Sequence, residues 1–242
     1  MAKSAEKLAL YGGLPVRGNL LPYGRQNLVD EDISSVENVL RSDWLTTGPR
    51  VGELEKNLAE LAETEFAVAV SSGTAALHSA MFALGIGPGD QVIVPAITFT
   101  ATANAIIYQG GTPVFVDVDR DTLLIDLEDV QRKLNAKTRA IVSVDYAGQP
   151  CQYEALIKIA QRHRVALIAD SCHAMGSLYK GSSVGSLVDM SIFSFHPVKL
   201  IASGEGGVIT TNDRSIYKEL LKLRSHGINK LEKKLKSFTK GS

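Results

Sequence analysis

The pattern of hydrophobic positions predicts alternating strands and helices along most of the chain. Short apolar runs, typical of buried strands, occupy 66–70, 91–95, 113–118, 140–145 and 165–170; a further run leads into Ser194, and another spans 208–211. Apolar residues recur at helical spacing over 34–45, 51–62, 74–84, 100–109, 127–134 and 153–163. This alternation predicts an α/β fold with a mostly parallel sheet between two layers of helices.

Polar side chains gather directly after the predicted strands. Ligands of parallel sheets bind at the carboxyl ends of the strands, so the residues there are the candidates for a site. They are Ser71, Ser72, Gly73 and Thr74, then Thr98 and Phe99, Asp145 and Tyr146, Asp170 and His173, and finally Ser194 and Lys199.

Composition narrows the class of protein. The 242 residues carry equal numbers of acidic and basic side chains, so charge favours neither nucleic acid nor membrane as a partner. Neither a membrane-length apolar run nor a signal-peptide core is present, and a cytoplasmic protein is expected. Cys151 and Cys172 have no metal-site spacing, and we interpret both as buried structural thiols.

Lys199 is the first candidate for chemistry. It follows a buried run that ends at Ser194, and a glycine-rich turn comes soon after. A lysine that is partly removed from water loses its proton more readily, and the neutral amine can form a Schiff base with an aldehyde. A lysine in a solvated loop is the alternative.

Three other features have a functional and a structural interpretation each. The turn at 71–74 suits a phosphate, because the free N–H groups of a first helical turn bind anions, although Ser72 or Thr74 could be only an N-cap. Asp170 ends an apolar strand and needs a partner, which could be a pyridinium N–H or the next helix. Phe99 could stack on a ring or be a core or rim residue, and His173 could share the site or be structural.

Together these residues supply an amine, a pyridinium partner, a phosphate-binding turn and a stacking face. Those are the protein-side parts of a pyridoxal 5′-phosphate site. In this order along the chain, they indicate a pyridoxal phosphate enzyme more strongly than any one of them does.

The same segments resemble the DegT-type family of nucleotide-sugar aminotransferases, from about residue 21 to residue 228. The matching motifs are LTTGP at 45–49, SGTAAL at 72–77, GDQVI at 89–93, TFTATAN at 98–104, DSCHAMG at 170–176, SFHPVK at 194–199 and GEGG at 204–207. PYGRQ at 22–26, DYAGQPC at 145–151 and RSHGI at 224–228 are similar to the pseudaminic-acid branch, whose members aminate C4 of a UDP-linked 4-keto-6-deoxy-N-acetylhexosamine.

The resemblance implies a role for each matching residue. Lys199 would bind pyridoxal phosphate as a Schiff base and move the proton, where related dehydratases have His. Asp170 would pair with the pyridine nitrogen beside His173. Gly73, Thr74 and Ser194 would hold the phosphate, and Phe99 would stack on the ring. The sugar nucleotide would contact Tyr23 and the turn of Asp43, Trp44, Leu45 and Thr46, with glutamate as the amino donor.

The resemblance also implies an organisation for the chain. We expect an N-terminal arm over 1–30, a cofactor-binding large domain over 31–228 and a basic, poorly ordered tail over 229–242. Family members continue past the position of Ile228 into a small domain, so a C-terminally truncated member is expected, and a homodimer with it. Three hypotheses stay open: a transaminase of this sugar, a sibling acting on another keto nucleotide sugar, and a silent remnant that binds cofactor or only partner subunits.

Overall fold

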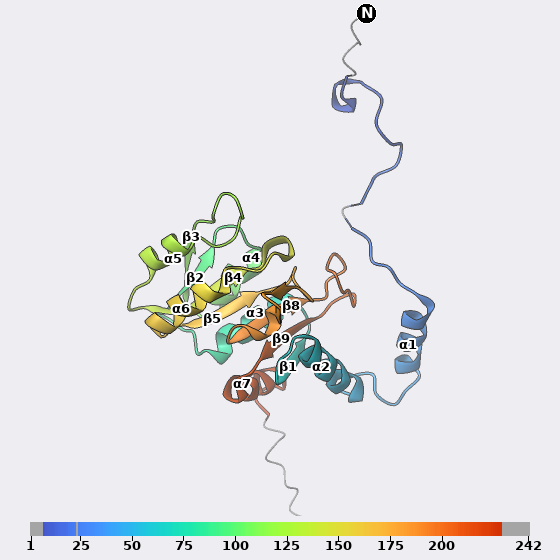
Figure 1. The fold of residues 1–242 in the computed structure, drawn as a ribbon. Helices are drawn as coiled ribbons and strands as arrows, with labels where there is room; N and C mark the ends of the chain where they lie inside the picture. The colour runs from blue at the N-terminus through green and yellow to red at the C-terminus, as the bar shows by residue number, and fades with distance from the viewer. Residues whose placement is uncertain (1–6, 23, 229–242) are drawn as a thin grey trace, which may run out of the picture.

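A computed structural model describes residues 7–22 and 24–228 (Figure 1). Its centre is a seven-stranded sheet in the order β1-β9-β8-β5-β4-β2-β3. The strands are β1 (Phe66–Val70), β2 (Gln91–Pro95), β3 (Thr112–Val116), β4 (Thr138–Val144), β5 (Ala166–Asp170), β8 (Met190–Ser194) and β9 (Gly207–Thr211). Only β9 runs against its neighbours, so this described sheet is mixed but mostly parallel, as predicted.

Helices cover both faces of the sheet (Figure 1). One face carries α3 (Gly73–Ala83), α4 (Thr100–Tyr108) and α7 (Arg214–Arg224), and the other carries α2 (Pro49–Leu61), α5 (Leu127–Lys133) and α6 (Tyr153–His163). Alternate strand residues divide between the two layers: Ile141 packs on the side of α5 and α6, whereas Val142 packs on the side of α3 and α4. Burial on both faces explains why the strands are almost continuously apolar.

Local signals set the ends of several helices. The Ser72 side chain caps α3 by accepting from the Ala75 N–H at 3.1 Å, and Asp126 and Asp213 cap α5 and α7 in the same way. Pro49 starts α2, where its missing N–H costs nothing. Most predicted elements match these bounds to within two residues, and 66–70, 91–95 and 153–163 match fully. The short hairpin of β6 (Leu178–Tyr179) and β7 (Ser182–Ser183), and α7, were not predicted.

The first part of the chain lies away from the sheet. The described residues of 7–22 and 24–28 contain one short 3-10 turn, and α1 (Asp30–Leu40) stands apart from the other helices (Figure 1). The helix predicted over 34–45 therefore begins four residues earlier and ends five residues earlier. Three acidic residues form its first turn, and the Asp32 side chain accepts from the Val29 N–H at 3.0 Å, which fixes the early start. In the described residues, no helix is long and apolar enough to cross a membrane.

Candidate active site

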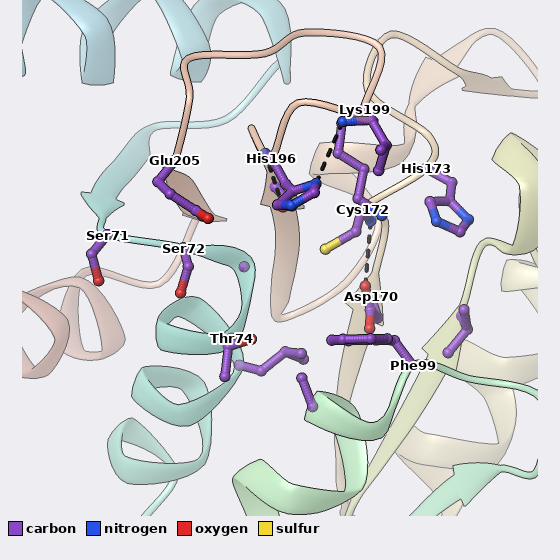
Figure 2. Close-up of a pocket in the computed structure, with 16 residues that line it drawn as sticks. Ser71, Ser72, Thr74, Phe99, Asp170, Cys172, His173, His196, Lys199 and Glu205 are labelled. Atoms are coloured by element: carbon purple, nitrogen blue, oxygen red, sulfur yellow. Dashed lines mark hydrogen bonds between the residues drawn. The ribbon is translucent and has the colours of Figure 1, made fainter. Parts of the chain in front are cut away.

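A cavity of about 640 Å³ opens at the carboxyl ends of β1, β2, β5 and β8 (Figure 2). Seven predicted cofactor residues line it: Gly73, Thr74, Phe99, Asp170, His173, Ser194 and Lys199. They come from four separate segments, and the strand order of the sheet brings them together. Ser71, Ser72, Cys172, His196 and Glu205 lie on the same walls.

The turn between β1 and α3 forms one end of the cavity. The Ser72 side chain accepts a hydrogen bond from the Ala75 N–H, and the Ser72 carbonyl accepts one from the Ala76 N–H. Gly73 and Thr74 belong to the first turn, where an α-helix offers its N–H groups no acceptor of its own. Ser72 is therefore both the N-cap that the structural interpretation expected and part of a turn suited to an anion.

Two glycines let this turn pack closely against its neighbours. A Cβ added at Gly73 would lie 2.9 Å from the Ser194 Cβ, and one added at Gly207 would lie 2.4 Å from the Ser72 carbonyl oxygen. Real Cβ atoms do not approach that closely, so glycine is required at both positions. The second contact also explains the last glycine of the GEGG motif, since Gly207 packs directly against the backbone of the turn.

Asp170 ends β5 and is 6% exposed. Its Oδ2 accepts from the Thr102 hydroxyl at 2.8 Å, and its Oδ1 accepts from the Cys172 N–H at 3.3 Å. The Thr98 hydroxyl donates to Thr102 at 2.7 Å. Among the described residues, Asp170 therefore has two donors while it still lines the cavity, where a further donor on a ligand could reach it.

Phe99 is 74% exposed although it is a large apolar side chain. It precedes α4 as its N-cap residue, and Figure 2 shows it next to Asp170 on the cavity wall. Exposed aromatic rings beside a carboxylate in a cavity suit stacking on a flat ligand. The interpretation of Phe99 as a core residue is wrong.

Lys199 lies on the loop that links β8 to β9. Its N–H donates to the His196 carbonyl at 2.8 Å, and the loop is closed at its base by the Phe195 N–H, which donates to the Gly206 carbonyl at 2.8 Å. Within the described part of the chain, Lys199 forms no ion pair, and its side chain lines the cavity near His196 and Cys172 (Figure 2). An amine so placed is free to react with a ligand.

His173 follows Asp170 on the same wall. Burial is the main reason that its pKa lies below the ordinary value, and the nearby positive charge of Lys199 lowers it further. The pKa of the Cys172 thiol is raised well above its usual range, chiefly by burial and then by Asp170. Cys172 is only partly buried and lines the cavity, so the prediction of a buried structural thiol is correct for Cys151 alone.

Asp145 was expected at the same edge but does not line the cavity. It is fully buried, and its carboxylate accepts from the Tyr153 hydroxyl at 2.7 Å, the Ser171 hydroxyl at 2.6 Å and the Cys151 N–H at 2.9 Å. Burial raises the pKa of this carboxyl against the effect of these donors. Its partner Ser171 is the neighbour of Asp170 in the chain, so Asp145 supports the site from behind.

The four predicted substrate residues that the structure describes lie outside the cavity. Asp43, Trp44 and Leu45 do not line the cavity, and Trp44 is 59% exposed. Thr46 lines a separate groove of about 1180 Å³ between α2 and α7. Tyr23 is outside the described residues, as is the predicted basic tail over 229–242. The contact of these residues with a sugar nucleotide stays a prediction.

The residues that are present fit pyridoxal phosphate. A carboxylate, a free amine, an exposed aromatic ring and a helix N-terminus face one cavity, and glycine allows the close packing at the phosphate end. Sequence reasoning did not assign a role to Thr102, which belongs to the TFTATAN motif. Its position, one helical turn after Thr98 at the start of α4, was the available signal.

Comparison with known proteins agrees with this class of site. The fold is that of the large domain of pyridoxal-phosphate-dependent sugar aminotransferases, and solved structures of such enzymes superimpose on it. A sugar aminotransferase from Streptococcus pneumoniae, solved in its pyridoxal phosphate form, is 36% identical, with a TM-score of 0.83, over 86% of this chain and 58% of its own. PseC of Helicobacter pylori, an aminotransferase involved in pseudaminic acid biosynthesis, is 35% identical, with a TM-score of 0.82, over 91% of this chain and 58% of its own.

DesI, solved in the presence of its TDP-sugar product, is 36% identical with a TM-score of 0.86, and the match covers 93% of this chain and 57% of DesI. The model of the DegT/DnrJ/EryC1/StrS aminotransferase family matches residues 26–241. The chain therefore belongs to this family, as predicted from its motifs. It spans less than two thirds of the length of these relatives.

Proposed function

We propose that this chain binds pyridoxal 5′-phosphate covalently through Lys199 and serves in the transamination of a keto sugar linked to a nucleotide. The observation that carries the proposal is the convergence of Lys199, Asp170, Phe99 and the Ser72–Gly73–Thr74 turn on one cavity. The solved pyridoxal phosphate form of the Streptococcus pneumoniae relative supports the choice of cofactor.

Each residue has a distinct task in this proposal. When bound, pyridoxal phosphate supplies an aldehyde and an electron-withdrawing ring, which stabilises negative charge on a carbon that loses a proton. Asp170, as a carboxylate, accepts a hydrogen bond from the ring N–H. The N–H groups of Gly73 and Thr74, with the Ser194 hydroxyl, hold the phosphate, and Phe99 covers one ring face and excludes water from it.

Lys199 has two tasks, because its amine first holds the cofactor and is then released. The released amine takes a proton from the carbon of one substrate and delivers a proton to the carbon of the other. Over the complete cycle the amino group passes from the donor to the keto carbon, and the donor leaves as a 2-oxo acid. Glutamate is the proposed donor.

We infer the sugar from the motifs at 22–26, 145–151 and 224–228: a UDP-linked 4-keto-6-deoxy-N-acetylhexosamine, aminated at C4. The likeness to PseC supports this choice. DesI, whose product is a TDP-sugar, is as similar in sequence and supports a sibling activity on another keto nucleotide sugar as the second candidate. The third candidate is a protein that binds cofactor, or only partner subunits, without turnover.

We also propose that the chain works as a homodimer. Apolar side chains of α1 are largely exposed, namely Ile33 at 53%, Val36 at 60% and Leu40 at 65%. Exposed apolar faces of this kind are typical of surfaces that pack against another subunit. Sedimentation analysis of the full chain tests this proposal, and a monomer at all concentrations would contradict it.

Titration with pyridoxal phosphate tests cofactor binding. The wild type should develop a visible absorbance band that Lys199→Ala lacks. Lys180→Ala is the matched control, because Lys180 pairs with Glu154 at 2.6 Å on the surface and should leave the band unchanged. No lysine-dependent band in the wild type would overturn the proposal. Loss of the band on adding glutamate, followed by its return on adding one keto sugar nucleotide, would identify the donor and the acceptor.

A further inference from the structure

Asp170 is held by a directional pair of hydroxyl groups from α4. A carboxylate can only accept hydrogen bonds, so the Thr102 hydroxyl must donate its single hydrogen to the Oδ2 of Asp170, 2.8 Å away. The oxygen of Thr102 is then free to accept, and it accepts from the Thr98 hydroxyl at 2.7 Å. The order of donation therefore runs from Thr98 through Thr102 to Asp170.

Thr102 supports the Asp170 carboxylate from the interior of the protein. Thr102 is fully buried, whereas Asp170 reaches the cavity. In the described part of the chain, the other donor to Asp170 is the Cys172 N–H at 3.3 Å on Oδ1, a longer bond that comes from the same turn as Asp170 itself. Thr102 is thus the contact that ties the carboxylate to a different element, the first turn of α4.

We propose that Thr102 is a positioning residue, which holds the Asp170 carboxylate in the orientation that meets the ring nitrogen of the cofactor. This inference rests on the proposed binding of pyridoxal phosphate and adds a specific requirement to it. The hydroxyl of Thr102 fixes the rotation of the carboxylate and stabilises its negative charge in the cavity wall, and Thr98 strengthens that bond by polarising the hydroxyl.

The α4 helix also connects the two residues that would contact the ring. Phe99 precedes α4, and Thr102 lies in its first turn, where its N–H donates to the Phe99 carbonyl at 3.0 Å. The stacking face and the support of the carboxylate therefore come from one rigid piece of backbone. The start of α4 therefore fixes the position of the Phe99 ring relative to the Asp170 carboxylate.

Four proteins test the inference by titration with pyridoxal phosphate: the wild type, Thr102→Val, Thr102→Ser and Thr100→Val. Valine keeps the shape of threonine and removes the donor, so Thr102→Val should weaken binding about 10- to 100-fold, the usual effect of a hydrogen bond to a charged group. Thr102→Ser restores the hydroxyl and should recover most of the affinity. Thr100→Val makes the same change at an exposed position of the helix and should have no effect.

Equal affinity of Thr102→Val and the wild type would overturn the inference while leaving cofactor binding intact. If Thr102→Val does not fold, Thr98→Val replaces it, with a smaller loss expected, and an unchanged affinity there counts against the inference. If the wild type itself shows no lysine-dependent band, the proposed function fails and crystal structures of cofactor-free wild type and Thr102→Val decide. A carboxylate that turns only in the variant supports the positioning role, and an unchanged Asp170 overturns it.

Discussion

The Tyr153 hydroxyl lies 2.7 Å from both carboxylate oxygens of Asp145, and neither side chain is exposed to solvent. This contact joins the start of α6 to the end of β4, directly behind the cavity wall that carries Asp170. A buried carboxylate is costly unless donors surround it, and Tyr153 shares that task with Ser171 and Cys151.

Replacing Asp145 by Asn, which carries no charge at any pH, should therefore change how the free energy of unfolding depends on pH. Burial raises the folded-state pKa of Asp145 above its unfolded value. Such a carboxyl stabilises the folded state below the unfolded pKa, and this contribution is lost as the pH rises toward the folded pKa. The free energy of unfolding of wild type relative to Asp145→Asn should fall with rising pH above about 4, at up to about 1.4 kcal/mol per pH unit.

Urea unfolding of both proteins at several pH values measures this difference. Tyr153→Phe is the companion variant, because it keeps the ring and removes one donor. Its free energy of unfolding should be about 1.5–3 kcal/mol lower than that of the wild type at neutral pH. A constant difference between wild type and Asp145→Asn across the whole pH range would show that Asp145 does not titrate as its burial implies.

Gly207 should not tolerate a side chain. The added Cβ of Gly207→Ala would lie 2.4 Å from the Ser72 carbonyl oxygen and 2.7 Å from the Gly73 nitrogen, and both are backbone atoms that cannot rotate away. We expect a loss of about 1–3 kcal/mol in unfolding free energy, together with weaker binding of pyridoxal phosphate, because the turn proposed to hold the phosphate must move.

Gly52→Ala is the matched control for this change. Gly52 lies inside α2, and a Cβ there meets nothing within 4 Å. The same substitution should therefore raise stability by about 0.5–1 kcal/mol, since alanine favours a helix more than glycine does. Gly207→Ala with wild-type stability and affinity would contradict the packing argument.

His173 should respond to the charge of Lys199. Burial and then Lys199 lower its pKa, so removing the amine in Lys199→Met should raise the pKa of His173 toward the ordinary value, with the contribution of burial remaining. An NMR titration of the imidazole signals in cofactor-free protein measures the midpoint. Lys180→Met removes a lysine that pairs with Glu154 and should leave the midpoint in place. An identical midpoint in Lys199→Met and wild type would place the two side chains too far apart to interact.

The sequence was sufficient to predict the mostly parallel sheet and the meeting of the seven candidate residues at one cavity, because both depend on patterns that span only a few neighbours. Apolar strands separated by helical spacing have few alternative arrangements, and polar residues after parallel strands meet at one edge. Phe99, Asp170 and Lys199 were found in this way.

The direction of individual side chains was less predictable. Asp145 follows β4 as Asp170 follows β5, yet it turns into the interior because Tyr153 and Cys151, contributed by a later loop and helix, supply donors there. The position of α1 outside the sheet layers was equally hard to predict, since its apolar residues recur at the same spacing as those of a core helix. Such features depend on long-range contacts that no local pattern records.

Side chains from α2 and α7 cover the open edge of β1. The Glu55 carboxylate accepts from the Ala69 N–H at 2.9 Å and pairs with Arg224, and the Arg224 guanidinium also donates to the Ala69 carbonyl at 3.3 Å. Both polar groups of Ala69 on this open edge are thus satisfied by one ion pair. Its side chains are only 15% and 31% exposed, so solvent screens it weakly.

A double-mutant cycle of Glu55→Ala and Arg224→Ala should therefore give a coupling energy above about 1 kcal/mol, measured by urea unfolding. The pair of Arg50 and Glu53 on α2 is the control, because its side chains are 70% and 56% exposed and its coupling should stay within about 0.2–1 kcal/mol. Equal coupling in the two pairs would show that the edge of β1 gains nothing from the Glu55–Arg224 contact. A larger coupling for Glu55 and Arg224 would show that α7 is fixed to β1 through Ala69, two residues before the turn at 71–74 that is proposed to hold the phosphate begins.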